Sequence, residues 1–451
     1  MVSDGDIPAS SPATLSATML TQADLTVPTL GPGRFDSPLL AKGRTLPDPR
    51  VRVRYQAREG TEDLEGEGLL FEKAGPRARI YFDPAETTAA FVTCGGLAPG
   101  LNNTIRSGFY ELTHNYGVRR VLGIQQGYKG LDPNEGLEPI ALNARDIDDI
   151  NDLGGTVLGT SRGNRDAANM VDYLEEHDID ILFCIGGDGT QRGAHALAEE
   201  VRKRSAARAI VGIPKTIDND VPFVYQSFGY LTALEEATGV LCRAHVEAKS
   251  HHNGIGLVKL MGRDAGFIAA GAAAAAQEAN FVLVPEVAFP LEGEGGFLDA
   301  LDRRIDLRHH AVIVVAEGAG QHLFEVGDAT TDASGNRRYR DIGIFLRDRI
   351  REHFREREVE ATIKYFDPSY SIRSVPPNAA DRFITDRMAR NAIHAAMAGK
   401  TDVMVGSWNQ STIWVPISAA VSERKRMNPA GDLWSAVLAT TGQPDWEPAG
   451  D

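Results

Sequence analysis

Short apolar runs that alternate with longer helical stretches are the feature of this sequence that most restricts its fold. From about Thr87 onward, the runs often end in turns that contain glycine. Strand–loop–helix alternation of this kind predicts an α/β protein with a largely parallel sheet. The expected strands are residues 89–94, 120–124, 181–185, 209–213, 255–260, 281–284, 311–315 and 362–365.

The number of expected strands also bears on domain organisation. So many strands would make a single sheet very wide, so we expect two α/β units. Residues 1 to about 50 are instead rich in Ser, Thr, Pro, Gly and Ala, and they predict a flexible arm or a surface wrap. In open α/β sheets, ligands bind beyond the carboxyl ends of the strands. Functional residues are therefore expected just after each apolar run.

Charge and cysteine content exclude several classes of function. The 451 residues carry 62 acidic and 47 basic side chains, a net charge of −15. A nucleic-acid surface or an anionic-membrane binder would need a basic field, so neither is expected. The three cysteines have no metal-ligand spacing and suggest no disulfide framework, which fits a reduced cytoplasmic setting. We expect neither a transmembrane span nor a secretory signal.

The first candidate site segment is Thr-Cys-Gly-Gly-Leu-Ala-Pro-Gly-Leu-Asn at 93–102, between an expected strand and a helix. Gly95, Gly96 and Gly100 let the backbone approach an anion, and the start of the helix supplies unpaired N–H groups. Glycine-rich turns at such positions also occur only for packing. Taken alone, the segment leaves both interpretations open.

The second segment, Ile-Gly-Gly-Asp-Gly-Thr at 185–190, also follows an expected buried strand. Its Asp188 stands beside glycines that can cradle phosphate, and Mg²⁺ typically takes one or two carboxylates plus phosphate oxygens. Thr190 is available to cap the next helix. The alternative interpretation is an aspartate that only stabilises a turn.

The third segment is Pro-Lys-Thr-Ile-Asp-Asn-Asp at 214–220. If it is extended, Asp218 and Asp220 face the same way, with Lys215 and Thr216 beside them. One carboxylate can then act as a base for a hydroxyl while the other holds metal-bound water. A plain surface turn is the alternative, and the strand directly before the segment argues against it.

Basic residues near other strand ends form a fourth group. Arg162, Arg263, Lys364 and Arg373 lie near glycine turns or strand ends in an otherwise acidic protein. A guanidinium fork matches phosphate oxygens, so the group suggests phosphate clamps. Glu317, after another apolar run, is placed to accept hydrogen bonds from sugar hydroxyls.

In this order, the segments resemble ATP-dependent 6-phosphofructokinases, most closely the plant and trypanosomal type. The resemblance runs from about Tyr81 to about Gly399. An isolated Gly-Gly-Asp-Gly-Thr would be shared with NAD kinases and lipid kinases, but the full series is specific. Its further motifs are Gly-Tyr-Lys-Gly-Leu at 127–131, Gly-Gly-Asp-Gly-Thr-Gln-Arg-Gly at 186–193, Ser-Phe-Gly at 227–229, Asn-Gly-Ile-Gly at 253–256 and Asp-Ala-Ser-Gly-Asn at 332–336.

The resemblance implies a fold and a reaction. The fold would be two facing α/β domains with largely parallel sheets, plus an N-terminal extension, in a homotetramer or homodimer. The reaction would be the Mg²⁺-dependent transfer of the ATP γ-phosphoryl group to the 1-hydroxyl of fructose 6-phosphate, in glycolysis. The implied parts are an extension at 1–80, a phosphodonor domain at 81–228 with 378–451, and a sugar-phosphate domain at 229–377.

The resemblance also implies residue roles. Asp218 would take the proton of the sugar 1-hydroxyl, and Arg263 would lie near the transferring phosphoryl group. Asp188 would hold Mg²⁺, with Asp220 in support. Lys364 would reach the 6-phosphate bound by a neighbouring subunit. The other phosphodonor positions would be Gly96, Tyr128, Arg162, Gly189, Thr190, Gly193 and Lys215, and the other sugar-phosphate positions Thr216, Met261, Gly262, Glu317, Tyr370 and Arg373.

Two departures from the bacterial enzymes limit what is carried over. Gly254 stands where those enzymes have another cross-subunit arginine, and Tyr110 replaces an arginine of their effector site. Substrate binding across the interface is therefore expected to differ in detail. Bacterial-style allostery is not expected.

The identity of the phosphodonor depends on two positions. Gly189 stands where pyrophosphate-dependent relatives usually carry Asp, which would crowd and repel the α-phosphate of a nucleotide. Lys215 is shared with the pyrophosphate users, yet plant and trypanosomal ATP enzymes combine this Gly with this Lys. We therefore expect ATP, with a pyrophosphate-dependent enzyme as the alternative.

Two different classes of protein fit the sequence less well. An NAD-kinase-like protein would lack the segment at 214–220. A non-catalytic regulatory subunit would tolerate loss of Asp188 or Asp218, and both are present.

Overall fold

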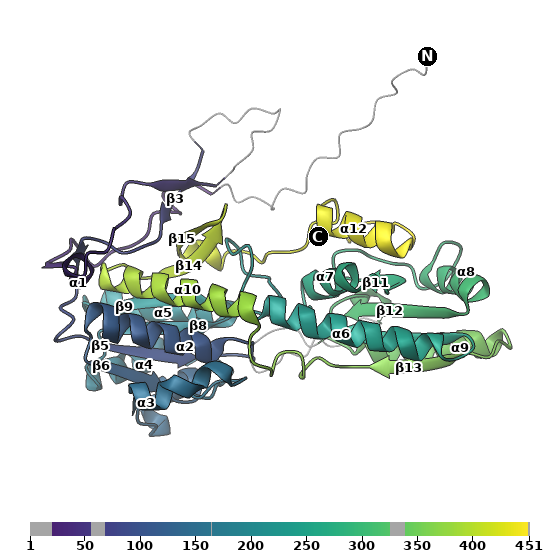
Figure 1. The fold of residues 1–451 in the computed structure, drawn as a ribbon, viewed down its shortest axis with the longest axis horizontal. Coiled ribbons are helices and arrows are strands. Elements are labelled where there is room, and N and C mark those ends of the chain that lie inside the picture. The colour runs from purple at the N-terminus through teal and green to yellow at the C-terminus, as the bar shows by residue number, and fades with distance from the viewer. Residues whose placement is uncertain (1–19, 56–67, 164, 325–338, 450–451) are drawn as a thin grey trace, which may run out of the picture.

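The computed structural model describes residues 20–55, 68–163, 165–324 and 339–449, arranged around two sheets (Figure 1). The larger sheet has nine strands in the order β2-β3-β15-β14-β9-β8-β5-β6-β7. Its inner run β14-β9-β8-β5-β6 is parallel, and the outer pairs are antiparallel. The strands are β2 (Arg52–Arg54), β3 (Leu70–Lys73), β5 (Thr88–Thr93), β6 (Arg120–Ile124), β7 (Ile140–Ala141), β8 (Ile181–Gly186), β9 (Ala209–Pro214), β14 (Val403–Trp408) and β15 (Ser411–Pro416).

The smaller sheet has four parallel strands in the order β11-β12-β10-β13. They are β10 (Gly254–Leu260), β11 (Phe281–Leu283), β12 (His310–Ala316) and β13 (Thr362–Phe366). Every strand expected from the sequence is present, so the α/β fold with largely parallel sheets is confirmed. The apolar runs identified these strands because parallel strands are covered on both faces; all residues of β5, β8 and β9 are buried.

Helices connect and cover the strands. In the larger unit, α5 packs on β8 and β9, while α2 and α10 lie side by side. In the smaller unit, α6 packs on β10 and β12 and against α7. The helices are α1 (Pro38–Ala41), α2 (Leu101–Tyr110), α3 (Ala144–Ile147), α4 (Ala167–Glu176), α5 (Asp188–Lys203), α6 (Tyr230–Lys249), α7 (Phe267–Ala276), α8 (Phe297–Arg308), α9 (Ile342–Glu356), α10 (Ala379–Met397), α11 (Ile417–Ala420) and α12 (Asp432–Thr441).

Shorter pieces complete the fold. A π-helical turn, Glu111–Tyr116, extends α2, and β1 (Phe35–Asp36) pairs with β4 (Arg79–Ile80). Among the described helices, none has both the length and the apolar composition that crossing a bilayer requires. The 3₁₀ turns are Gly127–Leu131, Pro133–Glu135, Asp148–Asp152 and Gln321–Leu323.

Each sheet has its own core of buried apolar side chains. Residues of β5, β8, β9 and α10 share the first core, and residues of β10, β12, α6 and α7 share the second. Met427, Trp434 and Trp446, near the C-terminus, belong to the second core. The domain boundaries remain a proposal, and this packing leads us to place residues 427–446 with the sugar-phosphate unit rather than the phosphodonor unit.

The described part of the N-terminal extension is a surface wrap rather than a free arm, because Leu25, Val27 and Leu39 belong to the core of the larger unit. Strand β3 pairs with β15, and β2 pairs with β3. Tyr55 stacks on Trp408 with ring centroids 5.5 Å apart, and the Trp408 indole N–H donates to the Tyr55 carbonyl at 2.6 Å. Residues 1–19 and 56–67 lie outside the described part.

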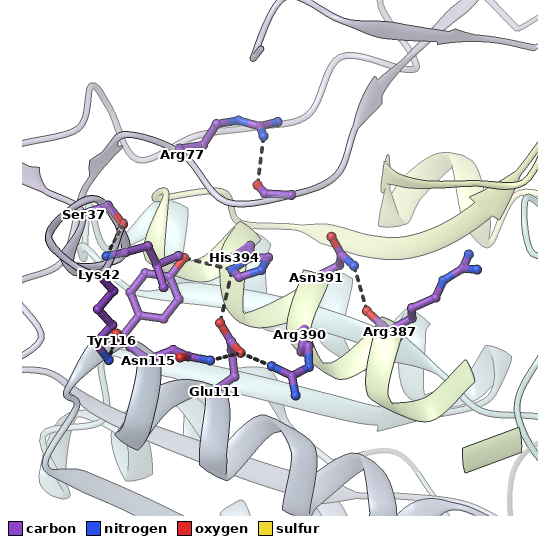
Figure 2. A network of polar contacts seen from close by, with 12 residues as sticks. Ser37, Lys42, Arg77, Glu111, Asn115, Tyr116, Arg387, Arg390, Asn391 and His394 are labelled. Carbon is purple, nitrogen blue, oxygen red and sulfur yellow. Dashed lines mark hydrogen bonds and ion pairs between the residues drawn. The ribbon is translucent and has the colours of Figure 1, made fainter. Parts of the chain in front are cut away.

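A partly buried polar network joins the π-helical turn after α2 to α10 (Figure 2). Glu111 is buried and accepts hydrogen bonds from Arg390 and Asn115, each at 2.6 Å. The Tyr116 hydroxyl lies 2.9 Å from Nδ1 of His394, whose pKa burial lowers to about 3. Lys42 of the extension donates to the Asn115 carbonyl at 3.0 Å. The network therefore holds the C-terminal end of α2, the end away from the first glycine-rich turn, against α10 and the extension.

Candidate active site

The first glycine-rich turn joins β5 to α2. Gly100, the N-cap of α2, has a φ of 109°, and a Cβ there would lie 2.7 Å from Thr385. Glycine is therefore required by conformation and by space. A Cβ on Gly96 would lie 2.9 Å from a guanidinium nitrogen of Arg373 and 3.7 Å from one of Arg162. Two of the predicted phosphate clamps thus converge on this turn.

The approach of Arg373 to Gly96 also joins the two units. Gly96 follows β5 of the larger sheet, whereas Arg373 follows β13 of the smaller one. The carboxyl ends of the two sheets therefore meet at this place, which we call the junction. Burial, and then the nearby charge of Arg162, lower the pKa of Arg373.

Lys215 connects the first turn with the third segment. It is buried directly after β9, and its ammonium donates to the Gly96 carbonyl. Burial is the main cause that lowers the pKa of Lys215 to about 8, and the charges of Arg373 and Arg162 lower it further. The ammonium is thus held among cations at the junction, an environment that suits an anionic ligand.

The second glycine-rich turn joins β8 to α5. Gly187 is the N-cap of α5, and it has no side chain with which to bond the first N–H groups of the helix. Thr190 lies within the first turn and is buried, so the expectation that it caps the helix is wrong. An uncapped helix start favours an anion.

Asp188, the first residue of α5, carries the carboxylate predicted to hold Mg²⁺. Its Oδ2 lies 3.1 Å from Arg192 Nε and 3.7 Å from Arg424 Nη2. The side chain keeps 22% of its surface exposed. The next residue is Gly189. Apart from its chain neighbours and the backbone of its own helix turn, no atom of the described residues lies within 4 Å of the position that a Cβ on Gly189 would take.

Tyr128 and Gly193 pack beside this turn and stabilise it. Tyr128 is buried, and its hydroxyl donates to the Thr190 carbonyl at 2.7 Å. A Cβ on Gly193 would lie 2.5 Å from the Tyr128 ring. The two residues therefore pack on each other and steady the start of α5.

The third segment is bent rather than extended. Asn219 has a φ of 56°, and its buried side chain accepts from the Ser227 N–H at 3.0 Å and donates to the Tyr225 carbonyl at 3.2 Å. The expectation of an extended segment is therefore wrong. Asn219 had no role in the expected site, although Asn is among the residues that readily adopt a left-handed backbone.

The bend separates the environments of the two aspartates. The Asp220 Oδ1 accepts the Thr216 hydroxyl at 2.7 Å, and the same hydroxyl lies 3.1 Å from the Asp218 N–H. The Asp218 Oδ1 is buried and has no hydrogen-bond partner among the described residues. Burial, with the nearby charges of Asp220 and Glu317, raises the pKa of Asp218 well above its usual value.

The smaller sheet contributes residues that follow β10 and β12. Met261, Gly262 and Arg263 follow β10, and Glu317 follows β12, with its N–H bonded to the Leu260 carbonyl at 3.0 Å. Burial raises the pKa of Glu317, which the charge of Arg263 partly offsets.

Other predicted sugar-phosphate residues follow β13 or lie on it. Tyr370 is 74% exposed, and the Arg373 guanidinium lies 4.8 Å from the centre of its ring. Lys364 is on the edge strand β13, in register with Gly256, and is half-buried. The predicted motif at 332–336 lies outside the described residues.

Residues that follow α11 also reach the site, and the sequence-based expectations did not include them. Arg424 pairs with Asp188 and Asp264, and the Lys425 N–H donates to the Asp220 carbonyl at 3.0 Å. The only local signal was a basic Arg-Lys-Arg run at 424–426 in an acidic chain.

Comparisons with known proteins agree with this arrangement. The family model described as "Phosphofructokinase" matches residues 88–396. The chain is 49% identical to the ATP-dependent 6-phosphofructokinase of Borreliella burgdorferi, over 84% of this chain and 86% of that protein. It is 44% identical to ATP-dependent 6-phosphofructokinase 7 of Arabidopsis thaliana, over 84% of this chain and 78% of that one. It is 45% identical to the Trypanosoma cruzi ATP-dependent 6-phosphofructokinase, over 83% of this chain and 77% of that protein.

A solved structure shows the same fold. The pyrophosphate-dependent phosphofructokinase of Marinobacter aquaeolei superposes with a TM-score of 0.65 at 20% identity, over 81% of this chain and 94% of that one. The matched family model, relatives above two-fifths identity and the shared fold lead to one conclusion: this chain belongs to the phosphofructokinase family.

Proposed function

We propose that this protein transfers the γ-phosphoryl group of ATP to the 1-hydroxyl of fructose 6-phosphate, forming fructose 1,6-bisphosphate and ADP, the phosphofructokinase step of glycolysis. One observation carries the proposal. Asp218 has a buried carboxylate oxygen with no hydrogen-bond partner among the described residues. Lys215, in the same segment, donates to the carbonyl of Gly96 in the first glycine-rich turn. Arg373, which follows a strand of the other sheet, lies beside the same Gly96.

The proposed chemistry begins at Asp218. The oxygen of the 1-hydroxyl forms a bond to the γ-phosphorus, and its proton passes to the Asp218 carboxylate. The bond from the γ-phosphorus to the bridging oxygen breaks, and ADP leaves with the electron pair. A raised pKa makes Asp218 a stronger base than an exposed aspartate, provided that it is ionised when the substrate arrives.

The cationic side chains hold the anions in place. In the proposed site, Arg162, Lys215 and Arg263 contact the phosphates of the donor and the transferring group, and Arg373 contacts the sugar phosphate. The start of α5 adds N–H groups and a favourable dipole. Phosphoryl transfer depends mainly on such positioning and charge stabilisation, so a site of this composition suffices.

The residues present also fit Mg²⁺. The carboxylates of Asp188 and Asp220 are oxygen ligands of the kind this cation prefers, and Asp188 remains partly exposed at the helix start. When bound, Mg²⁺ would neutralise phosphate charge. Asp188 would hold it directly, and Asp220, already bonded to Thr216, would orient its waters.

ATP is favoured over pyrophosphate by the open space at Gly189. Since no atom of the described residues fills the position where a side chain would project, the space is available to a nucleotide phosphate. We also propose a homo-oligomer in which Lys364 contacts the neighbouring subunit's sugar phosphate. A cytoplasmic location is proposed as well, consistent with Cys94, Cys184 and Cys242 being free thiols.

The test is an assay of the purified protein with fructose 6-phosphate and either ATP or pyrophosphate, in Mg²⁺ or in excess chelator. We expect turnover with Mg²⁺ and ATP only. A higher kcat/KM with pyrophosphate would overturn the choice of donor. Absence of turnover with either donor, with fructose 6-phosphate still bound, would instead favour a regulatory subunit.

A further inference from the structure

Residues 424–427, here called the crossing segment, connect the two units beside the candidate site. They lie between α11 and α12, where the chain passes from the larger unit to the smaller one (Figure 1). The Lys425 N–H donates to the Asp220 carbonyl at 3.0 Å, and the Met427 N–H donates to the buried Glu286 carboxylate at 2.9 Å. The segment is thus bonded to both units through its backbone.

The side chain of Lys425 attaches the crossing segment to the residues that follow the third segment. Its ammonium donates to the Val224 carbonyl at 2.7 Å and to the Tyr225 carbonyl at 3.1 Å. It also lies 5.0 Å from the centre of the Phe267 ring, at the start of α7. Since Asn219 bonds the same Tyr225 carbonyl, Lys425 and the bend that carries Asp218 share an anchor.

Arg424 contacts one carboxylate from each unit. Its Nη1 pairs with Asp264, which directly follows Arg263, and its Nη2 lies 3.7 Å from Asp188 at the start of α5. The Asp264 side chain is 15% exposed and also accepts the Tyr339 hydroxyl at 2.7 Å. A guanidinium can engage two carboxylates at once because its N–H groups point in fixed, divergent directions.

We propose that Arg424 is a positioning residue that couples the phosphodonor and sugar-phosphate sites by joining Asp188 to Asp264. The inference rests on the proposed function. A phosphodonor that binds at Asp188 changes the contact between Asp188 and Arg424. Because Arg424 also pairs with Asp264, this change affects the position of Asp264 and of the adjacent Arg263. Acceptor binding at that loop in turn alters the partner of Asp188. By linkage, each ligand must change the affinity of the other by the same factor.

The experiment measures this factor without turnover. Calorimetry gives the Kd of fructose 6-phosphate with and without saturating Mg²⁺ and a non-hydrolysable β,γ-imido ATP analogue. For the wild-type chain we expect a ratio of about fivefold or more, within the usual range of coupling between sites. Arg424→Ala should bring the ratio to within about twofold of unity while both ligands still bind. Arg424→Lys, which keeps the charge but not the fork, should give an intermediate ratio.

Two further variants separate coupling from charge and from folding. Arg426→Ala removes the same charge from an exposed neighbour in the crossing segment and should keep the wild-type ratio. Asp264→Asn removes the charge of the carboxylate that Arg424 pairs with, so it should also lower the ratio. This variant therefore tests the same contact if Arg424→Ala does not fold. Adding Arg424→Lys to Asp264→Asn should then lower the ratio little further.

The outcomes distinguish this inference from the proposed function. If the wild-type chain binds no ATP analogue, the proposed function fails. If both ligands bind but the wild-type ratio is near unity, or if folded Arg424→Ala or Asp264→Asn keeps the wild-type ratio, the coupling role of Arg424 is wrong. An equal loss in Arg426→Ala would show a general effect of charge and would also overturn the inference.

Discussion

Replacing Gly189 by Asp tests the basis of donor choice at a single position. A Cβ there would meet no atom within 4 Å beyond its chain neighbours and helix turn, so the new side chain starts in open space among the described residues. Gly189 is the second residue of α5, where the helix dipole favours an acidic side chain. We therefore expect the fold and its thermal stability to be retained.

The expected loss comes from charge in the donor site. At a separation of about 4 Å and an effective dielectric constant of about 20, two like charges repel by roughly 4 kcal/mol. Since about 1.4 kcal/mol corresponds to tenfold, kcat/KM for ATP should fall by roughly a thousandfold. Pyrophosphate lacks the nucleoside part and the α-phosphate, so weak use of pyrophosphate with Lys215 retained is also expected.

A coupled assay of ADP release over a range of ATP concentrations measures this effect. Gly189→Ala is the matched control, because it fills the same open space without a charge. It should lose less than about tenfold, the equivalent of about 1.4 kcal/mol. If folded Gly189→Asp keeps kcat/KM for ATP within tenfold of wild type, the reasoning is refuted. Equal losses in both variants would assign the effect to volume rather than charge.

Four other predictions concern the candidate site. Asp218→Asn should lower kcat by ~10²–10⁴ with little change in fructose 6-phosphate affinity, and a variant that keeps half the wild-type kcat would exclude Asp218 as the base. Because the pKa of Asp218 is raised, kcat/KM should begin to fall with decreasing pH at a pH well above 3.8. Because the pKa of Lys215 is lowered to about 8, kcat/KM should also fall as the pH rises through about 8. A pH profile of kcat/KM that is flat across both ranges would contradict these shifts. Asp188→Asn should raise the Mg²⁺ concentration for half-maximal rate by about tenfold or more, since a contact to a charged group is worth at least about 1.5 kcal/mol; an unchanged Mg²⁺ titration would remove Asp188 from the metal site. Lys364→Ala should mainly raise the KM for fructose 6-phosphate, and verified hybrids with a donor-site variant should regain activity if Lys364 reaches across an interface.

Local sequence determined the strands and most of the chemistry-bearing turns. The apolar runs predicted β5, β8, β9, β10 and β12 because a parallel strand covered on both faces carries apolar side chains at most of its positions. Glycine-rich turns follow β5 and β8, as the sequence indicated. Asp188, Asp218, Arg263 and Glu317 were predicted as site residues because each closely follows such a strand or lies in such a turn.

Only the tertiary structure decided how these parts meet. Asn219 bends the segment of Asp218 because Ser227 and Tyr225 bond its side chain, and these contacts have no local signature. The approach of Arg373 to Gly96, and the pairing of Arg424 with Asp188 and Asp264, join residues far apart in the chain. The hydrophobic periodicity of a sequence indicates which face of a helix or strand is buried. Which distant side chain lies opposite depends on how helices and sheets pack together, and that information is spread over the whole sequence.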